Sequence, residues 1–585
     1  MELALFAAAF CLLTVFVVRY ITRERFIYFW DYVEYHNVYI RLGRKLALNP
    51  YPALQSVYHS IRENEYNFLP IMFLLPFRFA FGPGRLSFIL AITVMFAFPS
   101  IVLFSFAAAG LRADSAVQGT FEKVGLTFLA LSGFALMPLL WIPVLIGSVD
   151  VGGVIIVLIV LMLYFRADLA DQSMGNLVAI GLLLSLLVLF RRWFAYWVVG
   201  FFGALFICEG LRYLWNKERR VHWVCLARNI LMMGGISVCS FFLVATPIAW
   251  KMLTTNYRDI YSAYRSSHPL IHNLAALYNH TGLLMLVLAG LGTALSLVNE
   301  KRRNVAFFLC IQFVISFALF ARTQDFVLSS GGHSIGAQHL YLTLVTIGLF
   351  AVFFMQDLFL RVRSHAGKAA LLLIFLAGSL ANFCVTFMPR AGEIAKDLNF
   401  ALPKIRQYPM VRTDLDQMQA MLDTLHDLIR TSPASIYILA SSFSLNSSVA
   451  QGACFLVEPT QSNLAYRIFP TTDVDKRDGF PVLFLEARYV VLTIPFGYHL
   501  APEDQRVIGI LANQLVSGEG IGKSYDRLNY EFRLEDGSHA FIYQRSRPLD
   551  PLEVKALSDQ FVGFYPGHRN RFELSPELIR KVSAL

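Results

Sequence analysis

The sequence predicts an α-helical polytopic membrane protein of about thirteen spans, with a soluble α/β domain at its C-terminal end. Composition is the first indication, because 56% of the 585 residues are hydrophobic, against roughly 45–50% in ordinary soluble proteins. Distribution is the second, because apolar runs of near bilayer-spanning length recur from Met1 to about Pro389 and then stop. The chain therefore divides into a membrane part, residues 1–390, and a soluble part, residues 391–585.

The membrane part contains a series of apolar segments that are long enough, or nearly so, to cross a bilayer. They lie at residues 2–20, 67–82, 86–110, 121–147, 148–166, 175–190, 193–209, 224–249, 281–298, 304–321, 338–360 and 367–388. Pro138 and Pro143 can divide the segment 121–147 into two, because proline interrupts a helix. This division gives thirteen spans and places the two chain ends on opposite sides of the membrane.

The charge of the loops predicts the orientation. Loops 210–223, 299–304 and 361–368 are rich in Lys and Arg, and such loops favour the cytoplasm. The C-terminal domain is then expected outside, and a bacterial inner membrane is the expected location. The long first loop, residues 21–66, is also basic although this topology places it outside. We interpret its charge as a means of binding phosphate.

The last third of the chain has the pattern of a small α/β domain. Short apolar or alternating segments predict strands at Ser435–Ala440, Tyr489–Ile494, Tyr530–Leu534 and His539–Arg545. Amphipathic patterns predict helices at Asp414–Ile429 and Glu503–Leu515. The sequence Glu535-Asp536-Gly537 predicts a hairpin turn between the last two strands.

Acidic residues beside predicted spans are the first candidates for chemistry. Asp31 and Glu34 follow the first helix among aromatic residues, where acids are costly unless they have a role. A carboxylate here could act as a general base or orient an acceptor; the alternative is that both acids only pair with nearby arginines. Asp150 is the only acid in a long apolar stretch and is expected at the outer face. It is a site candidate, and a cap of the next helix is an equal alternative.

Arginines lie at the same predicted face. Arg191 and Arg192 adjoin a membrane boundary, and guanidinium groups match phosphate oxygens in geometry. Arg258, in the basic and aromatic loop 250–280, and Arg322, after a later span, are further candidates for phosphate binding. Each of these arginines could instead be an ordinary headgroup anchor.

Polar residues between two later spans are candidates for substrate contact. Asp325, His333 and His339 lie in one short outer loop, and Tyr35 belongs to the first loop. Metal binding by the Asp and the two His is an alternative, but their spacing is loose, and the chain has no Cys-x-x-Cys pair. We therefore assign no metal ligands and no certain cofactor, and a divalent metal ion stays an open alternative.

Together these features resemble the GT-C superfamily of membrane glycosyltransferases, which includes the protein O-mannosyltransferases and the aminoarabinose transferases of lipid A. The resemblance covers about residues 1–390. It rests on Asp31 with Glu34 after the first helix, on Tyr66-Asn67-Phe68-Leu69-Pro70 at the next helix, on the second outer acid Asp150 and on a soluble domain outside. The first loop lacks a clear Asp-Glu or Asp-x-Asp pair, which leaves metal dependence open.

The resemblance implies that a sugar is transferred from a polyprenyl-phosphate donor, at the outer face, to a cell-envelope glycan, lipid or protein. By the same resemblance, Asp31 matches the catalytic acid of the first outer loop, and Asp150 matches the second outer acid by position only. An inverting transfer with a carboxylate base is expected, with cationic side chains stabilising the phosphate leaving group. Such a donor needs no nucleotide, which agrees with the missing phosphate-binding loops.

The main alternative is a transporter or flippase of a lipid-linked glycan. Transporters often have inverted repeats and broken helices at matching positions, and the sequence has no such symmetry. A polymerase or ligase of undecaprenyl-linked glycans is a close variant of the transferase, and a non-catalytic scaffold is a third reading. The expected partners are the lipid-linked donor, the acceptor and membrane lipids. Nucleic acid is not expected, because the basic residues lie in loops between apolar helices.

Overall fold

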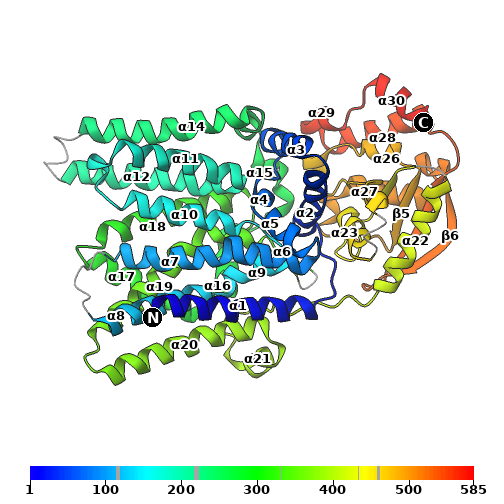
Figure 1. Ribbon diagram of the computed structural model, residues 1–585. Coiled ribbons are helices and arrows are strands. Elements are labelled where there is room, and N and C mark those ends of the chain that lie inside the picture. Colours follow the sequence, from blue (N-terminus) through cyan, green and yellow to red (C-terminus); the bar gives the residue numbers. More distant parts are fainter. Residues whose placement is uncertain (113–118, 216–222, 331–332, 432–433, 458–461, 585) are drawn as a thin grey trace.

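A computed structural model describes residues 1–112, 119–215, 223–330, 333–431, 434–457 and 462–584. A bundle of long helices forms one end of the molecule, and a smaller unit of helices and strands forms the other (Figure 1). The N-terminus lies at the end of the bundle that is farther from the C-terminal unit. This arrangement agrees with a helical membrane part, and a small sheet lies in the part that follows it.

Within the described residues, seven helices are long and apolar enough to cross a membrane. They are α1 (Glu2–Arg23), Arg85–Gly110 (α6, Arg85–Ile92, continued through α7, Phe98–Gly110), Arg192–Leu214 (mostly α12, Ala195–Trp215), α14 (Trp223–Thr254), α18 (Arg303–Thr323), Ala337–Arg361 (mostly α19, Tyr341–Arg361) and α20 (His365–Phe387). Two shorter apolar helices, α10 (Val151–Tyr164) and α11 (Met174–Phe190), lie among them. The protein is thus a multi-span membrane protein, as the sequence predicts.

Two further candidate spans are bent. Helices α8 (Thr120–Ala135) and α9 (Pro138–Ile146) meet at 46°, and α16 (Pro269–Thr281) and α17 (Leu283–Val298) meet at 104°. Pro138 begins α9, where its missing N–H is tolerated, so the predicted break in 121–147 is a bend within one candidate span. If each bent pair is one span, nine candidate spans result, and the predicted total of thirteen is not confirmed.

The prediction of a single span at residues 67–82 is wrong. The structure has two short helices there, α4 (Leu69–Met72) and α5 (Leu75–Phe81). Each has a proline near its start, Pro70 and Pro76. Because proline cannot donate a backbone hydrogen bond to the preceding turn, it prevents one continuous helix. An apolar run is therefore necessary for a span but does not guarantee one.

The first loop folds into α2 (Asp31–Leu48) and α3 (Pro50–Glu63), which lie at the end of the bundle beside the C-terminal unit (Figure 1). Tyr51, Leu54 and Tyr58 of α3 are exposed, as expected of an aromatic, interface-lying helix. The junctions α17–α18 and α19–α20, which carry predicted basic loops, lie at the opposite end. In the remaining basic loop, 210–223, residues 216–222 lie outside the described residues.

A five-stranded mixed sheet forms the centre of the C-terminal unit. Its order is β4 (Ile468–Phe469), β3 (Ile436–Leu439), β5 (Tyr489–Ile494), β7 (His539–Arg545) and β6 (Tyr525–Arg533). Strand β3 pairs in parallel with both neighbours, and β7 pairs antiparallel with both of its own. Gly537 makes the predicted hairpin turn with a φ of +82°. Strand β6 begins earlier than predicted, and the two-residue β4 was not predicted.

Both faces of this sheet are buried, but by different parts of the chain. One face packs on α27 (Arg506–Ser517) and α28 (Pro551–Phe564). The other packs on α22 (Leu415–Thr431), α23 (Ser447–Val457) and the segment 26–33 of the first loop. Arg25 is tied to the same unit, because its N–H donates to Met410 at 2.9 Å. The loop that precedes the predicted catalytic acid is therefore part of the C-terminal core.

Candidate active site

Arg191 is the centre of a buried polar cluster at the end of the bundle beside the C-terminal unit. It directly follows α11, in extended backbone, and its side chain is only 5% exposed. The guanidinium pairs with Asp150, donates to the Tyr35 hydroxyl and lies 3.6 Å from Asp31 Oδ2. It also lies over the Tyr66 ring, 5.2 Å from its centre. The fold thus joins predicted residues from four separate parts of the sequence: α2, Tyr66, Asp150 and Arg191.

Asp150 is the buried acid of this cluster. Its carboxylate accepts a hydrogen bond from Trp193 Nε1 at 2.7 Å and others from Arg191 and the Ser148 hydroxyl. It makes no side-chain cap on α10, so the capping alternative does not describe this structure. Because its side chain is 2% exposed and well supplied with donors, its main effect is to hold Arg191.

Asp31 is the more accessible acid of the cluster and is half-buried. It is the first residue of α2 and follows Trp30, whose φ of +44° turns the chain sharply. The side chain of Asp31 is 31% exposed. Burial raises the pKa of Asp31 above its ordinary range, while the charge of Arg191 opposes this and that of Asp150 adds to it. A reachable carboxylate with a raised pKa suits a general base.

A second charged group lies next to the first. Arg192 Nη1 is 2.5 Å from Glu65 Oε2, and Lys251 Nζ is 3.0 Å from the other oxygen of Glu65. The hydroxyls of Tyr257 and Tyr261 accept from Arg192 at 3.3 and 3.4 Å. Burial alone would raise the pKa of Glu65, but Arg192 and Lys251 lower it, so this acid stays ionised. Sequence reasoning missed Glu65, although it directly precedes Tyr66, because its partners Arg192 and Lys251 are far away in the sequence.

Glu34, Arg258 and Arg322 are among the predicted residues that do not join the Asp31 cluster. Glu34 forms an ion pair with Arg41, and its side chain is 40% exposed. Arg258, on the short helix α15 (Tyr257–Ile260), and Arg322, in the last turn of α18, are exposed. Within the described residues neither has an ion pair. They are available to solvent or headgroups at this end of the bundle.

The predicted polar loop behaves mainly as structure. Asp325 is buried and accepts from the Ser266 N–H at 2.7 Å and from Asn273 Nδ2 at 3.3 Å. His339 Nδ1 lies 3.3 Å from the Phe326 carbonyl oxygen, and its ring stands edge-on to Trp193, next to the cluster. His333 pairs through its backbone in a small hairpin, and its side chain lies outside the described residues.

The described residues contain no group of three or more His, Cys, Asp or Glu that could hold a metal ion. Asp325 and His339 are occupied by an amide and by backbone groups, as described above.

The C-terminal unit covers the cluster. Trp30 donates through Nε1 to Asp473 Oδ2 at 2.9 Å and through its backbone N–H to Ser448 Oγ at 2.6 Å. Lys476 Nζ lies 3.4 Å from Asp259 Oδ1, and His568 Nε2 lies 2.9 Å from the other oxygen of Asp259. The site therefore lies at a junction of the two parts, where water can be excluded.

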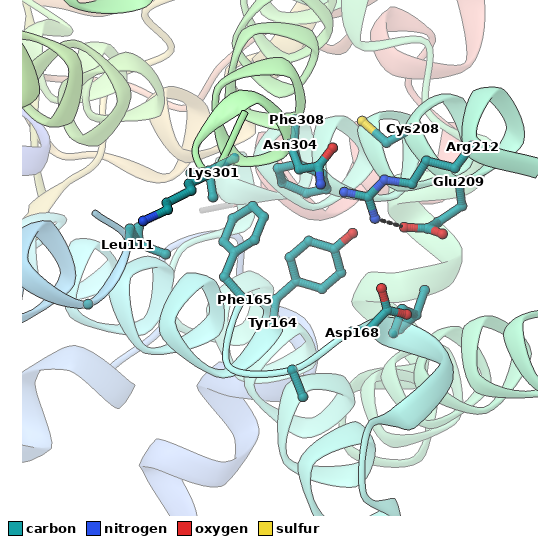
Figure 2. Close-up of a pocket in the computed structure, with 14 residues that line it drawn as sticks. Leu111, Tyr164, Phe165, Asp168, Cys208, Glu209, Arg212, Lys301, Asn304 and Phe308 are labelled. Atoms are coloured by element: carbon teal, nitrogen blue, oxygen red, sulfur yellow. Dashed lines mark hydrogen bonds and ion pairs between the residues drawn. The ribbon is translucent and has the colours of Figure 1, made fainter. Parts of the chain in front are cut away.

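A cavity of about 270 Å³ lies elsewhere, at the C-terminal ends of α10 and α12, which are the ends away from the Asp31 cluster (Figure 2). Its polar lining includes Asp168, Glu209, Arg212, Lys301 and Asn304. Arg212 Nη1 pairs with Glu209 at 2.6 Å within one helix. None of these residues was predicted as a site, and none belongs to the Asp31 cluster.

No protein-family model matches the sequence, and no curated protein is detectably similar. Among solved structures, ArnT from Cupriavidus metallidurans bound to undecaprenyl phosphate is similar with a TM-score of 0.52 and 10% identity, over 92% of this chain and 97% of that one. Its apo state gives a TM-score of 0.49 and 12% identity over the same shares. ArnT is a lipid A aminoarabinose transferase of the GT-C type. The likeness confirms the resemblance predicted from the sequence at the level of the fold: this chain has the fold of a GT-C membrane glycosyltransferase.

Proposed function

We propose that this protein is a membrane glycosyltransferase that moves a sugar from a polyprenyl-phosphate donor to a cell-envelope glycan, lipid or protein. One observation carries the proposal: the reachable acid Asp31 lies beside the buried pair of Arg191 and Asp150, at the covered end of a GT-C fold. The similar protein ArnT is bound to undecaprenyl phosphate in its own structure, which supports a lipid phosphate as the donor's carrier.

In the proposed reaction, Asp31 is the base. The acceptor's hydroxyl or amine proton passes to the Asp31 carboxylate while the acceptor atom attacks the anomeric carbon of the sugar. The bond between that carbon and the phosphate oxygen breaks, and its electron pair leaves with the polyprenyl phosphate. A single displacement of this kind inverts the anomeric configuration. Asp150 holds Arg191, and Arg191 holds Asp31 and Tyr35.

Cationic side chains beside this cluster would stabilise the leaving phosphate. Arg192 and Lys251 share Glu65 and leave that group one net positive charge. Arg191 shares its charge with two acids and is better suited to positioning. Arg258 and Arg322 are exposed and remain candidates for the phosphate as it approaches from the membrane surface.

We further propose eleven crossings, from the nine candidate spans and the two shorter apolar helices α10 and α11. Compared with the predicted thirteen, the span at 67–82 is absent and 121–147 crosses once, so the parity is unchanged. The basic loops then lie in the cytoplasm, while the first loop and the C-terminal domain, residues 391–585, lie outside. The bacterial inner membrane is the proposed location.

The test is sugar transfer in membranes from a panel of radiolabelled polyprenyl-phosphate sugars. Asp31→Asn keeps the size of the side chain but not the base, so we expect transfer to fall at least about 100-fold. The matched control is Glu63→Gln, an exposed acid of α3, which should leave transfer unchanged. Normal transfer by Asp31→Asn would remove Asp31 as the base. No transfer by folded wild type with any donor would favour a transporter or flippase.

A further inference from the structure

One arginine of the C-terminal unit lies at the junction with the membrane part. Arg477 belongs to the short helix α25 (Asp475–Asp478). Its neighbour Lys476 reaches across to the loop after α14, 3.4 Å from Asp259 Oδ1 and 3.2 Å from Ser262 Oγ. Helix α25 is therefore held against the outer end of the bundle.

The segment that carries Arg477 is also fixed beside Asp31. Asp473 accepts from Trp30 Nε1 at 2.9 Å, and Trp30 directly precedes Asp31. The backbone N–H of Asp473 donates to Asp478 Oδ2 at 2.8 Å, which closes the loop around α25. The ring of His499 also lies 4.4 Å from that of Trp30, centre to centre. The hydrogen bond between Asp473 and Trp30 thus holds this segment beside the candidate base.

The guanidinium of Arg477 has a fixed orientation and a free edge. Nε and Nη2 donate to the two oxygens of Asp478 at 2.6 and 2.9 Å. Within the part of the chain that the structure describes, Nη1 has no hydrogen bond, and the side chain is 29% exposed. A carboxylate that holds one edge of the fork pre-organises the other edge for a second anion.

The charge of Arg477 acts on the candidate site. Burial raises the pKa values of Asp31 and Tyr261, and in both residues Arg477 is one of the charges that oppose this. The Tyr261 hydroxyl also lies 3.4 Å from Arg192 Nη2 and 3.5 Å from Glu65 Oε2. The charges of Arg477 and Arg192 therefore both act on Tyr261, from different parts of the chain, and that of Arg477 also acts on Asp31.

We propose that Arg477 completes the substrate site from the C-terminal side by binding the phosphate of a polyprenyl phosphate. The inference rests on the proposed function and adds a residue to it. The ligand is a phosphate ester at the membrane surface. Its phosphate oxygens accept a hydrogen bond from Nη1 of Arg477, because Nε and Nη2 already donate to Asp478. The C-terminal domain then binds substrate, in addition to covering the site. It also explains why the first loop is anchored in the C-terminal core: base and phosphate ligand are held on one rigid unit.

The experiment measures binding of undecaprenyl phosphate to the purified full-length protein in phosphatidylcholine nanodiscs. Arg477→Gln should raise the dissociation constant about tenfold, the loss of one charge-assisted hydrogen bond. Arg477→Lys keeps the charge without the planar fork and should raise it about threefold. The matched control is Arg506→Gln. Arg506 is an exposed arginine at the start of α27, beside Phe564 of α28, and this variant should bind as the wild type does. Undecaprenol, which lacks the phosphate, should bind all four proteins equally.

Unchanged binding of undecaprenyl phosphate by Arg477→Gln overturns the inference, even if the enzyme transfers sugar normally. If that variant does not fold, an unchanged dissociation constant for Arg477→Lys overturns it instead. If Arg477→Gln weakens the binding of phosphatidylglycerol as much as that of undecaprenyl phosphate, Arg477 is an ordinary headgroup contact. That result also overturns the inference. If binding depends on Arg477 but wild type transfers no sugar, the phosphate site stands and the proposed transferase activity fails.

Discussion

The two ends of α10 and α12 carry similar residues but differ in construction. At one end, Asp31, Asp150 and Arg191 come from three segments, meet Tyr35 and lie under the C-terminal unit. At the other end, Glu209 and Arg212 pair within one turn of one helix and line an open cavity. With about 1.5 Å of rise per residue, the 14 residues of α10 separate these ends by roughly 20 Å.

This difference indicates which of the two polar clusters is the better candidate for a functional site. An ion pair three residues apart on one helix, such as Glu209 with Arg212, forms from local geometry alone. A cluster drawn from distant segments needs the whole fold to assemble it, and here one of its acids stays 31% exposed while the other is 2% exposed. The cavity of about 270 Å³ lies at the other end, so a search for cavities alone would not have led to the Asp31 cluster.

The largest expected difference between the ends comes from Arg191→Gln. Removing this arginine leaves Asp150 buried without its cation, which should cost about 3–5 kcal/mol of unfolding free energy, with loss of transfer. Thermal unfolding of the purified protein measures the cost. The control is Arg166→Gln, an exposed arginine beyond the far end of α10, for which we expect less than about 0.5 kcal/mol. Equal destabilisation by both variants would contradict the comparison.

A smaller effect is expected from pH. Because the base must be ionised and burial raises the pKa of Asp31, transfer should decline, about tenfold per unit, from a pH clearly above the roughly 3.9 of an ordinary aspartate. The measurement is the pH dependence of kcat in membranes, and a rate that stays constant down to about pH 4 would contradict the assignment.

Unfolding of the C-terminal unit should not imitate this pH effect. Burial raises the pKa of Asp473 to about 6 and that of Asp475 to about 7. The folded state therefore binds these protons more tightly than the unfolded state does. Their contribution to stability increases as the pH falls through 7 and 6 and decreases as it rises. A fluorescence melt at each pH checks that the protein remains folded.

The smallest expected effect is at the opposite end. Glu209→Gln breaks a pair within one helix and leaves Arg212, which is 26% exposed, to water or headgroups. We expect transfer within about twofold of the wild type and a stability loss of about 1–2 kcal/mol, because Glu209 is only 4% exposed. A tenfold loss of transfer in a protein with an unchanged melting temperature would bring the cavity into the reaction and end the contrast between the two ends.

Much of the site could be predicted, but in fragments. Asp31, Asp150 and Arg191 were each visible as charged residues in apolar surroundings, where charge is costly. Their pairing was not visible, because no local pattern connects residues so far apart. Glu65 and Arg477 were missed for a related reason: both lie in polar, charged stretches of the sequence, Glu63–Glu65 and Asp475–Asp478, where one more charge is not a distinctive signal.

The sequence by itself determined the multi-span bundle, most of the C-terminal strands and the end of the bundle at which the acids would lie. Hydrophobic length and period set these features, and both are local. The tertiary structure decided that prolines split residues 67–82, that segment 26–33 packs into the C-terminal core, and that Arg191 holds two distant acids. Those outcomes depend on which buried surfaces meet, because a buried charge takes its partner from whatever the fold brings within hydrogen-bond distance.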